Sequence, residues 1–207
     1  AMVDPQAAAR NFAALALLCL PWADFSVSTR DPWQELARMG WGLLTPAVPN
    51  VLELFSALAN TLAFALQGVA LGAVAGFILA LGYGCAFVRR FAAFIRAIHE
   101  LFWALLFVQL LSLSPAAGVL AIAIPYEGNF AKIYGELFEE VDPQAHDALP
   151  AGTGRLSAFL FTVLPQCSAH MITYTRYRLE CGIRSSAVLG FVGLPTVGFH
   201  LETALKQ

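Results

Sequence analysis

Arginines and one glutamate recur at helical spacing toward the end of the chain. Arg176, Glu180 and Arg184 are four residues apart, so in an α-helix they share one face. Arg178 falls on another face. The surrounding segment is largely apolar, and ionised groups in a membrane helix are costly unless they are paired or face a wet cavity. Three interpretations stay open: the shared face lines a path for an anion, Glu180 forms a structural pair with the arginines, or these side chains extend to the outer membrane interface.

The histidines offer a second kind of chemistry. His99 precedes Glu100 and His146 precedes Asp147, pairs that could suit a metal or acid–base site. They do not form a motif such as H-E-x-x-H, which disfavours a metalloenzyme. The sequence also contains no G-x-x-x-x-G-K-[ST] loop for nucleotide phosphates. A membrane-embedded enzyme that uses His and acidic residues stays an alternative, and energy from ATP would have to come from a partner.

The composition of the chain fits a lipid bilayer. Of 207 residues, 58% are hydrophobic and 13% are charged, whereas soluble domains carry about 25% charged residues. A bilayer core about 30 Å thick needs about 20 apolar residues per spanning helix, so this length allows several spans. The net charge of −2 disfavours nucleic-acid binding, which normally shows a basic stripe. We therefore expect a single all-α polytopic membrane domain over residues 1–207.

Five apolar segments are expected to cross the membrane. Their approximate limits are 11–28, 55–84, 99–113, 115–135 and 166–192. The second segment carries Gly68, Gly72 and Gly76 at four-residue intervals, a spacing that lets another helix approach closely. The first segment lacks a clear small-residue cleavage site after its apolar stretch, so we interpret it as a membrane anchor rather than a secretory signal.

Two polar segments separate these spans. Residues 30–50 are rich in Trp and Pro and are expected to lie in the membrane interface. Arginines after the second span mark the cytoplasmic side, which also places the N-terminus in the cytoplasm. These are Arg89, Arg90 and Arg96. The 136–165 segment then falls in the cytoplasm, and its composition is typical of soluble helices. We expect it to be presented to a partner, with a solvated connector as the alternative.

The segment from Asp147 to Pro165 reads DALPAGTGRLSAFLFTVLP. It resembles the cytoplasmic signature of binding-protein-dependent ABC permeases, an E-A-A triplet followed by a Gly and, after a fixed interval, a Leu-Pro. The triplet stands one residue closer to the Gly than is usual. The resemblance implies that the Gly lets the chain turn between short helices and that the Leu-Pro starts the next span. It assigns contact with an ATPase to Asp147, Ala148, Leu149, Gly152, Leu164 and Pro165.

Three further runs resemble the permeases of phosphonate uptake. They are RAIHELFWALLFV (96–108), SPAAGVLAI (114–122) and YTRYRLECGIRSSAVLGFVG (174–193). The chain departs from that family at residues 193–198, where GLPTVG replaces a GAGGIG-like run. The family has six spans, so one more is expected than the five visible here.

The resemblance implies a function and a set of partners. The chain would be the permease subunit of a type I ABC importer in a bacterial inner membrane, and not an enzyme. Its substrate would be phosphonate or a related oxyanion such as phosphite or hypophosphite. Two ATPase subunits, a second permease subunit and an external binding protein would complete the importer, with ATP and Mg on the ATPase and no cofactor on this chain. Arg176, Glu180 and Arg184 are then the candidate path residues. A permease-like scaffold stays an alternative.

Overall fold

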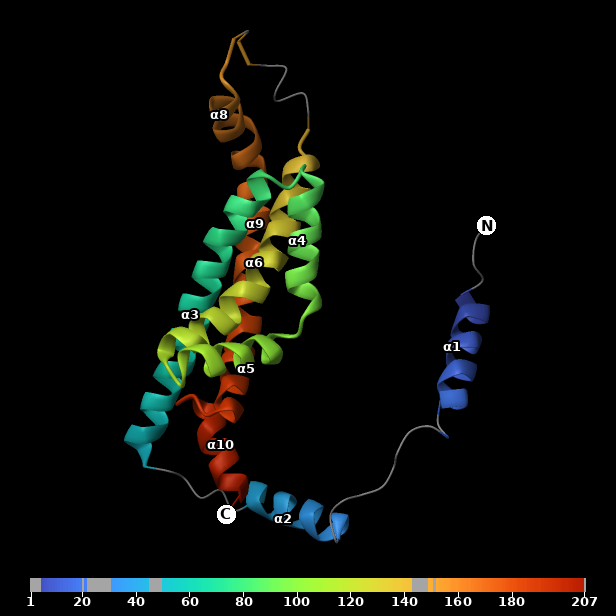
Figure 1. Cartoon of the computed structure of the whole chain (residues 1–207), viewed down its shortest axis with the longest axis vertical. Helices are drawn as coiled ribbons and strands as arrows, with labels where there is room; N and C mark the ends of the chain where they lie inside the picture. Colours follow the sequence, from blue (N-terminus) through green and yellow to red (C-terminus); the bar gives the residue numbers. More distant parts are fainter. Residues whose placement is uncertain are drawn as a thin grey trace. The chain divides into compact units, whose positions relative to one another are not determined.

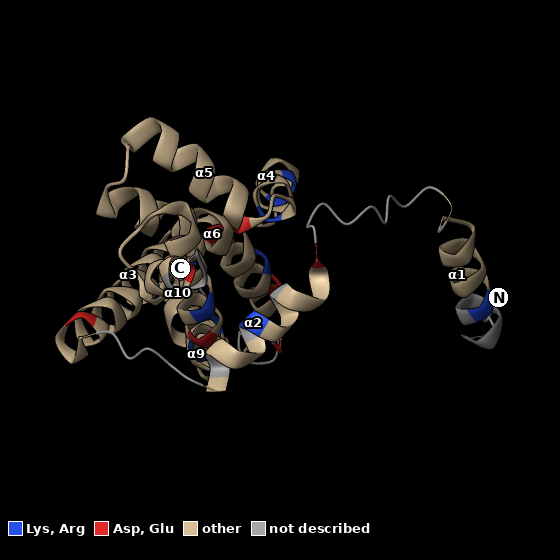
Figure 2. Ribbon diagram, turned by 90° about the horizontal axis from the view of Figure 1, so that it is seen from below, with Lys and Arg blue, Asp and Glu red and all other residues tan. Residues whose placement is uncertain are grey.

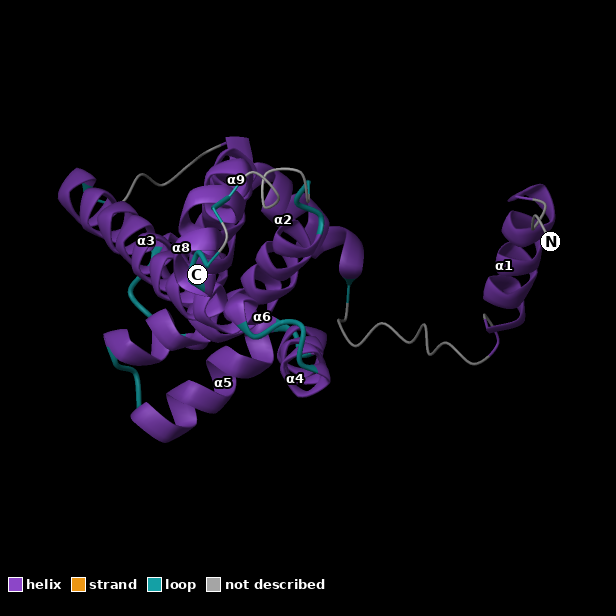
Figure 3. Cartoon of the chain, turned by 90° about the horizontal axis from the view of Figure 1, so that it is seen from above, coloured by secondary structure: helices purple, strands orange, loops and turns teal. Residues whose placement is uncertain are grey.

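The computed structural model describes residues 5–19, 21, 31–44, 50–142, 149–150 and 152–206. These residues form helices and loops, and no strand occurs among them (Figure 3). The all-α expectation is therefore confirmed for the part of the chain that the structure describes. The chain divides into two compact units, residues 1–47 and 48–207, which are described separately.

The first unit contains two short helices. Helix α1 (Pro5–Cys19) is apolar from Arg10 onward, and the end of the expected first span, residues 22–28, lies outside the described residues. Helix α2 (Pro32–Leu44) lies within the segment expected at the membrane interface, of which residues 45–49 are not described. It exposes Trp33 and Trp41, side chains that favour the level of the lipid headgroups.

The second unit is a helical bundle built around one central helix. Helices α3 (Val51–Leu81), α6 (Pro115–Glu139) and α9 (Leu164–Val188) run side by side, with α4 (Ala86–Ala97) along α6 (Figure 1). Helix α5 (Glu100–Leu111) crosses the bundle and packs on α6. Because α6 contacts all four neighbours, its Ile122 and Phe130 are the largest fully buried apolar side chains near the centre.

Two helical stretches are long and apolar enough to cross a membrane. They are α3 and the continuous run Arg155–Val192. Helices α4 and α5 meet at a bend of 87°, and they would supply a third span if the bent pair counts as one. The segment expected to span at 99–113 is therefore a 12-residue helix on one side of a sharp break. Helix α6 follows the expected segment 115–135 but carries Glu127 and Lys132, which lower its hydropathy.

The last long run begins earlier than the Leu-Pro signature implies. It comprises α8 (Arg155–Ala158), the π-helical turn η2 (Phe159–Val163), α9 and the 3-10 turn η3 (Leu189–Val192). Leu164 and Pro165 thus lie inside a helix that begins at Arg155, rather than at its start. Pro165 has no N–H to donate, and the π turn before it, in which the Leu164 N–H reaches the Phe159 carbonyl, absorbs the interruption.

The C-terminal end of the bundle is closed by a buried polar cluster. After η3 the chain turns at Gly193, which has a φ of 97°, and α10 (Val197–Lys206) packs against α3 and α9. The hydroxyl of Ser186 donates to the Thr61 carbonyl at 2.6 Å, and the Thr61 hydroxyl accepts from the Val197 N–H at 3.1 Å. These bonds satisfy the buried hydroxyls and hold α3, α9 and α10 together.

Three glycines of α3 bring α3 and α6 together. Gly68, Gly72 and Gly76 are one helical turn apart, and all three are buried against α6. A Cβ atom at Gly72 would lie 2.9 Å from the carbonyl oxygen of Ala123, and one at Gly76 would collide with the Cβ atom of Phe130. The prediction of a close helix approach at these residues is confirmed. We call this contact the glycine seam.

The glycine seam can be tested by adding one methyl group. Gly72→Ala is expected to lower the melting temperature of the purified chain, because the new Cβ atom must push against the α6 backbone. Overpacking of this kind costs about 1–3 kcal/mol of unfolding free energy. Gly84→Ala is the control, since a Cβ atom there meets nothing within 4 Å. Circular dichroism in detergent records the melting of both variants. Equal melting temperatures would contradict the close contact at the glycine seam.

Candidate functional site

The break between α4 and α5 exposes a helix start in the middle of the bundle. Ile98 and His99 have extended backbone angles, so α4 ends at Ala97 and α5 begins at Glu100. The His99 ring accepts a hydrogen bond at Nδ1 from the Leu101 N–H at 3.2 Å and caps the new helix. The free N–H groups of a helix start favour negative charge nearby. The break therefore creates a polar position between otherwise apolar helices.

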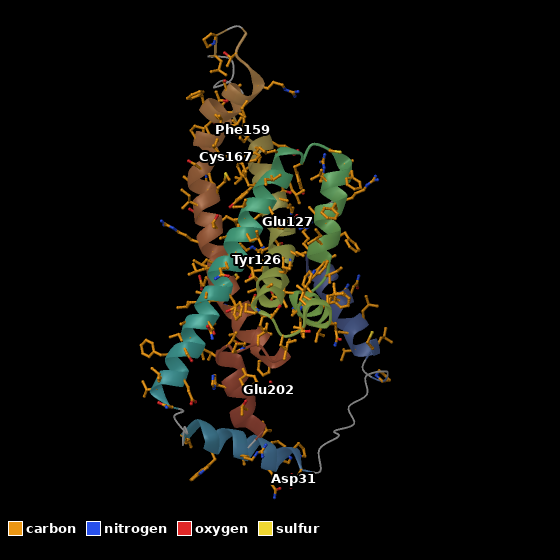
Figure 4. All side chains as sticks on the ribbon, turned by 60° about the vertical axis from the view of Figure 1, so that its left-hand side comes forward. Asp31, Tyr126, Glu127, Phe159, Cys167 and Glu202 are labelled. Atoms are coloured by element: carbon orange, nitrogen blue, oxygen red, sulfur yellow. The ribbon has the colours of Figure 1, made fainter. Side chains whose placement is uncertain are left out.

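A cavity of about 310 Å³ lies at this break. Its walls come from the α4–α5 junction, the middle of α6 and the second half of α9. Tyr126, one of its lining residues, lies partway along the bundle (Figure 4). The charged lining residues are Arg96, Arg178, Arg184 and Glu100. Figure 2 marks in blue the basic residues carried by α4 and α9, the helices that supply the three arginines.

Arg178 is held by an aromatic surround. Its guanidinium carbon lies 5.2 Å from the ring centroid of Tyr174, 5.5 Å from that of Tyr126 and 5.8 Å from that of Tyr177. Its Nε donates to the Tyr174 hydroxyl at 2.7 Å. Cation–π contacts of this kind stabilise a desolvated charge and fix its direction. The sequence placed Arg178 away from the charged face of α9, but the structure brings it to the cavity together with Arg184.

Glu100, Ser185 and Tyr126 form a hydrogen-bonded chain along the cavity wall. The Ser185 hydroxyl lies 2.8 Å from both carboxylate oxygens of Glu100 and 3.2 Å from the Tyr126 hydroxyl. A hydroxyl has one proton to give, so Ser185 donates to the Glu100 carboxylate and accepts from Tyr126. The chain ties the start of α5 to α6 and α9.

The cavity carries more positive than negative charge. Within residues 50–142 and 152–206, neither Arg96, Arg178 nor Arg184 forms an ion pair within 4.0 Å. Glu100 is the acidic residue among those that line the cavity. Three guanidinium groups against one carboxylate leave a cationic site. Arg96 and Arg184 are exposed and Arg178 is half-buried, so an anion can reach these guanidinium groups, and the excess of positive charge attracts it.

The other two candidate path residues lie outside the cavity lining. Arg176 and Glu180 are exposed on α9, and in the described part of the chain Glu180 forms no ion pair with either arginine. The interpretation of Glu180 as a structural partner therefore has no support in this structure. One face of α9 carries an exposed polar stripe, which we call the α9 stripe. It consists of Thr173, Arg176, Glu180 and Arg184.

The residues assigned to ATPase contact are described only in part. Asp147 and Ala148 lie outside the described residues. Gly152 has a φ of 94°, and its neighbour Thr153 donates from both its N–H, at 3.2 Å, and its hydroxyl, at 2.7 Å, to the Pro150 carbonyl. The positive φ matches the turn that the sequence assigned to this glycine. Leu149 precedes Pro150 on the N-terminal side of this glycine.

Several site residues were not singled out from the sequence as cavity residues. They are Arg96, Arg178, Glu100, Ser185 and Tyr126. One signal was available for Arg178, because Tyr174 precedes it by four residues and aromatic side chains at that spacing can cover an arginine. The contribution of Glu100 and Ser185 depends on the bend between α4 and α5.

Comparison with known proteins places the chain among transport permeases. It is 35% identical over 122 residues to the phosphate-import permease protein PhnE of Mycolicibacterium smegmatis, covering 58% of this chain and 23% of that protein. It is 30% identical over 184 residues to the phosphite transport system permease protein PtxC of Stutzerimonas stutzeri, covering 83% and 66%. It is also 34% identical over 89 residues to the Escherichia coli protein named "Putative cryptic phosphonate transport system permease protein PhnE2", covering 42% and 73%. The chain belongs to the phosphonate and phosphite ABC transport permeases.

This membership confirms the family recognised in the sequence, and with it a polytopic membrane protein. Its relatives are permease subunits, which agrees with the expectation of a transport component rather than an enzyme. The chain spans 23% of the length of the Mycolicibacterium smegmatis protein and 44% of that of a further relative, the Stutzerimonas stutzeri protein named "Putative phosphite transport system permease protein HtxE". Neither a family model nor a solved structure matches it.

The exposed position of Glu180 leads to a stability prediction. Glu180→Gln is expected to change the unfolding free energy by less than about 0.5 kcal/mol, as at other positions without a partner. Ser186→Ala on the same helix should cost about 1 kcal/mol, because it removes a fully buried hydrogen bond. Thermal unfolding of both variants measures the difference. A larger loss of unfolding free energy for Glu180→Gln than for Ser186→Ala would favour the interpretation that Glu180 pairs with the arginines.

Proposed function

We propose that the chain is the permease subunit of an ABC importer that carries a phosphorus oxyanion through a path that includes the arginine-lined cavity. The observation that carries this proposal is a cavity lined by three arginines and one glutamate, in which no arginine forms an ion pair with a described residue. Unpaired charges at such a position are expensive, so they point to an anionic substrate. Relatives named for phosphate, phosphite and phosphonate transport support a phosphorus oxyanion as the substrate, and our candidates are phosphonate, phosphite and hypophosphite.

The spans follow from this proposal. The five expected spans correspond to α1, α3, the bent pair α4–α5, α6 and the run from Arg155 to Val192, within a type I importer fold that has a sixth. Broken helices are common at transporter substrate sites because a helix start can face an anion there. The α9 stripe is exposed in the single chain, and its charges are unsuited to lipid. We place it toward a second permease subunit, so that the path runs between the two.

The proposed orientation in the membrane is based on the positive residues at one end of the bundle. Helices α3 and α6 end there, α4 and α8 begin there, and α4 carries Arg89 and Arg90 close to its start (Figure 1). Positive residues of this kind mark the cytoplasmic side of a bacterial inner membrane, which also puts the N-terminus inside. The loop around Gly152 lies at the same end and is the proposed contact with two partner ATPases, which bind ATP and Mg. An external binding protein would deliver the anion from the opposite side.

The first test removes one cavity charge. Arg184→Gln is expected to leave the complex assembled and to reduce phosphite or phosphonate uptake about tenfold, since a lost charge contact of about 1.4 kcal/mol corresponds to that factor. Arg90→Gln, an exposed arginine outside the cavity, serves as the control. Uptake of labelled substrate into proteoliposomes measures both. Full uptake with Arg184→Gln would remove this residue from the path.

The second test concerns coupling to the ATPase. Gly152→Val is expected to uncouple ATP hydrolysis from transport without unfolding the bundle, because a β-branched residue resists the φ of 94° at this turn. A Cβ atom at Gly154 also meets nothing within 4 Å, and that glycine has a φ of −65°, so Gly154→Val is the matched control. Co-purification of the ATPase and substrate uptake are measured together. Normal values of both in Gly152→Val would refute the coupling role.

A further inference from the structure

Of the described residues that line the cavity, Glu100 alone is acidic. It is the first residue of α5 and lies at the bend, on the same cavity as Arg96, Arg178 and Arg184. An anion that enters this cavity meets a carboxylate as well as three guanidinium groups. If the Glu100 carboxylate pairs with an arginine, the substrate must displace it. If it stays apart from the arginines, it repels the substrate across the cavity.

The position of this carboxylate is fixed by its hydrogen bonds. Both of its oxygens lie 2.8 Å from the Ser185 hydroxyl, and that hydroxyl is supported by Tyr126 at 3.2 Å. Ser185 and Tyr126 are both buried, whereas Glu100 is half-buried at the cavity wall. Glu100 is thus held on the cavity wall without an ion pair to an arginine in the described part of the chain.

We propose that Glu100 is a built-in competing carboxylate that weakens oxyanion binding and so allows the substrate to leave. This inference rests on the proposed function and adds a residue that sets affinity. Like charges about 8 Å apart weaken binding by about thirtyfold at an effective dielectric constant of about 20, and by about sixfold where water raises that constant to about 40, so we expect a change of about tenfold. Three arginines alone would bind a phosphorus oxyanion tightly and slow its release. Transport needs a site weak enough to empty.

Ser185 is the positioning residue of this arrangement. Its hydroxyl keeps the carboxylate beside α6 and α9. Without it, the Glu100 side chain is free to approach the arginines and compete with the substrate more directly. Loss of the Ser185 hydroxyl should therefore weaken oxyanion binding, whereas neutralising Glu100 should strengthen it. Opposite effects from two residues that share a hydrogen bond would not arise from a loss of structure.

The test measures binding of methylphosphonate and of phosphite to the importer complex in lipid nanodiscs without nucleotide, by titration calorimetry. Glu100→Gln keeps the side-chain shape and an acceptor for Ser185, and it is expected to lower the Kd about tenfold and to lower the maximal uptake rate. Glu53→Gln, an exposed residue in the first turn of α3, is the control and should leave the Kd unchanged. An unchanged or higher Kd in Glu100→Gln overturns the inference, as does the absence of binding in both wild type and variant.

The second measurement isolates Ser185 and guards against a folding defect. Ser185→Ala is expected to raise the Kd severalfold in the wild-type background and to have no effect on it in the Glu100→Gln background. A Kd effect of equal size in both backgrounds would show a structural role and overturn the assignment of Ser185. The two proposals fail differently: full uptake by Arg184→Gln removes Arg184 from the proposed path, whereas binding that is insensitive to Glu100→Gln removes only the competing carboxylate.

Discussion

The glycine seam between α3 and α6 is the contact on which the remaining structure depends. Because three successive turns of α3 have no side chain on the α6 side, the two backbones come into direct contact. Close approach makes α6 the centre of the bundle, with room for α4 at Gly128, where a Cβ atom would lie 2.8 Å from the Ala92 carbonyl. In a bilayer there is little hydrophobic gain from joining helices, so packing of small residues supplies the attraction.

The central position of α6 also explains where the charged groups lie. Helix α6 brings Tyr126 to the bend between α4 and α5, and α9 brings Arg178 and Arg184 to the same place. The tyrosines around Arg178 replace part of the hydration that the guanidinium group loses. Arg184 and Arg96 have no such cover, and a passing anion can approach them. The site thus combines one arginine held in place with two that are accessible.

The sequence predicted the all-α class, the family, the close helix approach at Gly68, Gly72 and Gly76 and the turn at Gly152. The all-α class and the close helix approach depend on local composition and spacing, whereas the family and the turn at Gly152 came from the resemblance to known permeases. The cavity could not be predicted in the same way, because it depends on the bend at Ile98 and His99. No Pro or Gly marks that bend, and a helical wheel separates Arg178 from Arg176 and Glu180, as the structure does, without showing that the face of Arg178 meets the cavity. Helical spacing shows which residues share a face, but not which neighbouring helix covers it.

The π-helical turn Phe159–Val163 determines the rotational phase of α9. A π turn holds one residue more than an ordinary turn, so the helix after it is rotated by about 100° relative to an uninterrupted continuation of α8. Without the extra residue, the side of α9 that carries Arg178 and Ser185 would turn away from α6, and the α9 stripe would shift by the same angle. The extra residue of this π turn therefore determines which side chains of α9, a helix of more than 20 residues, face the cavity.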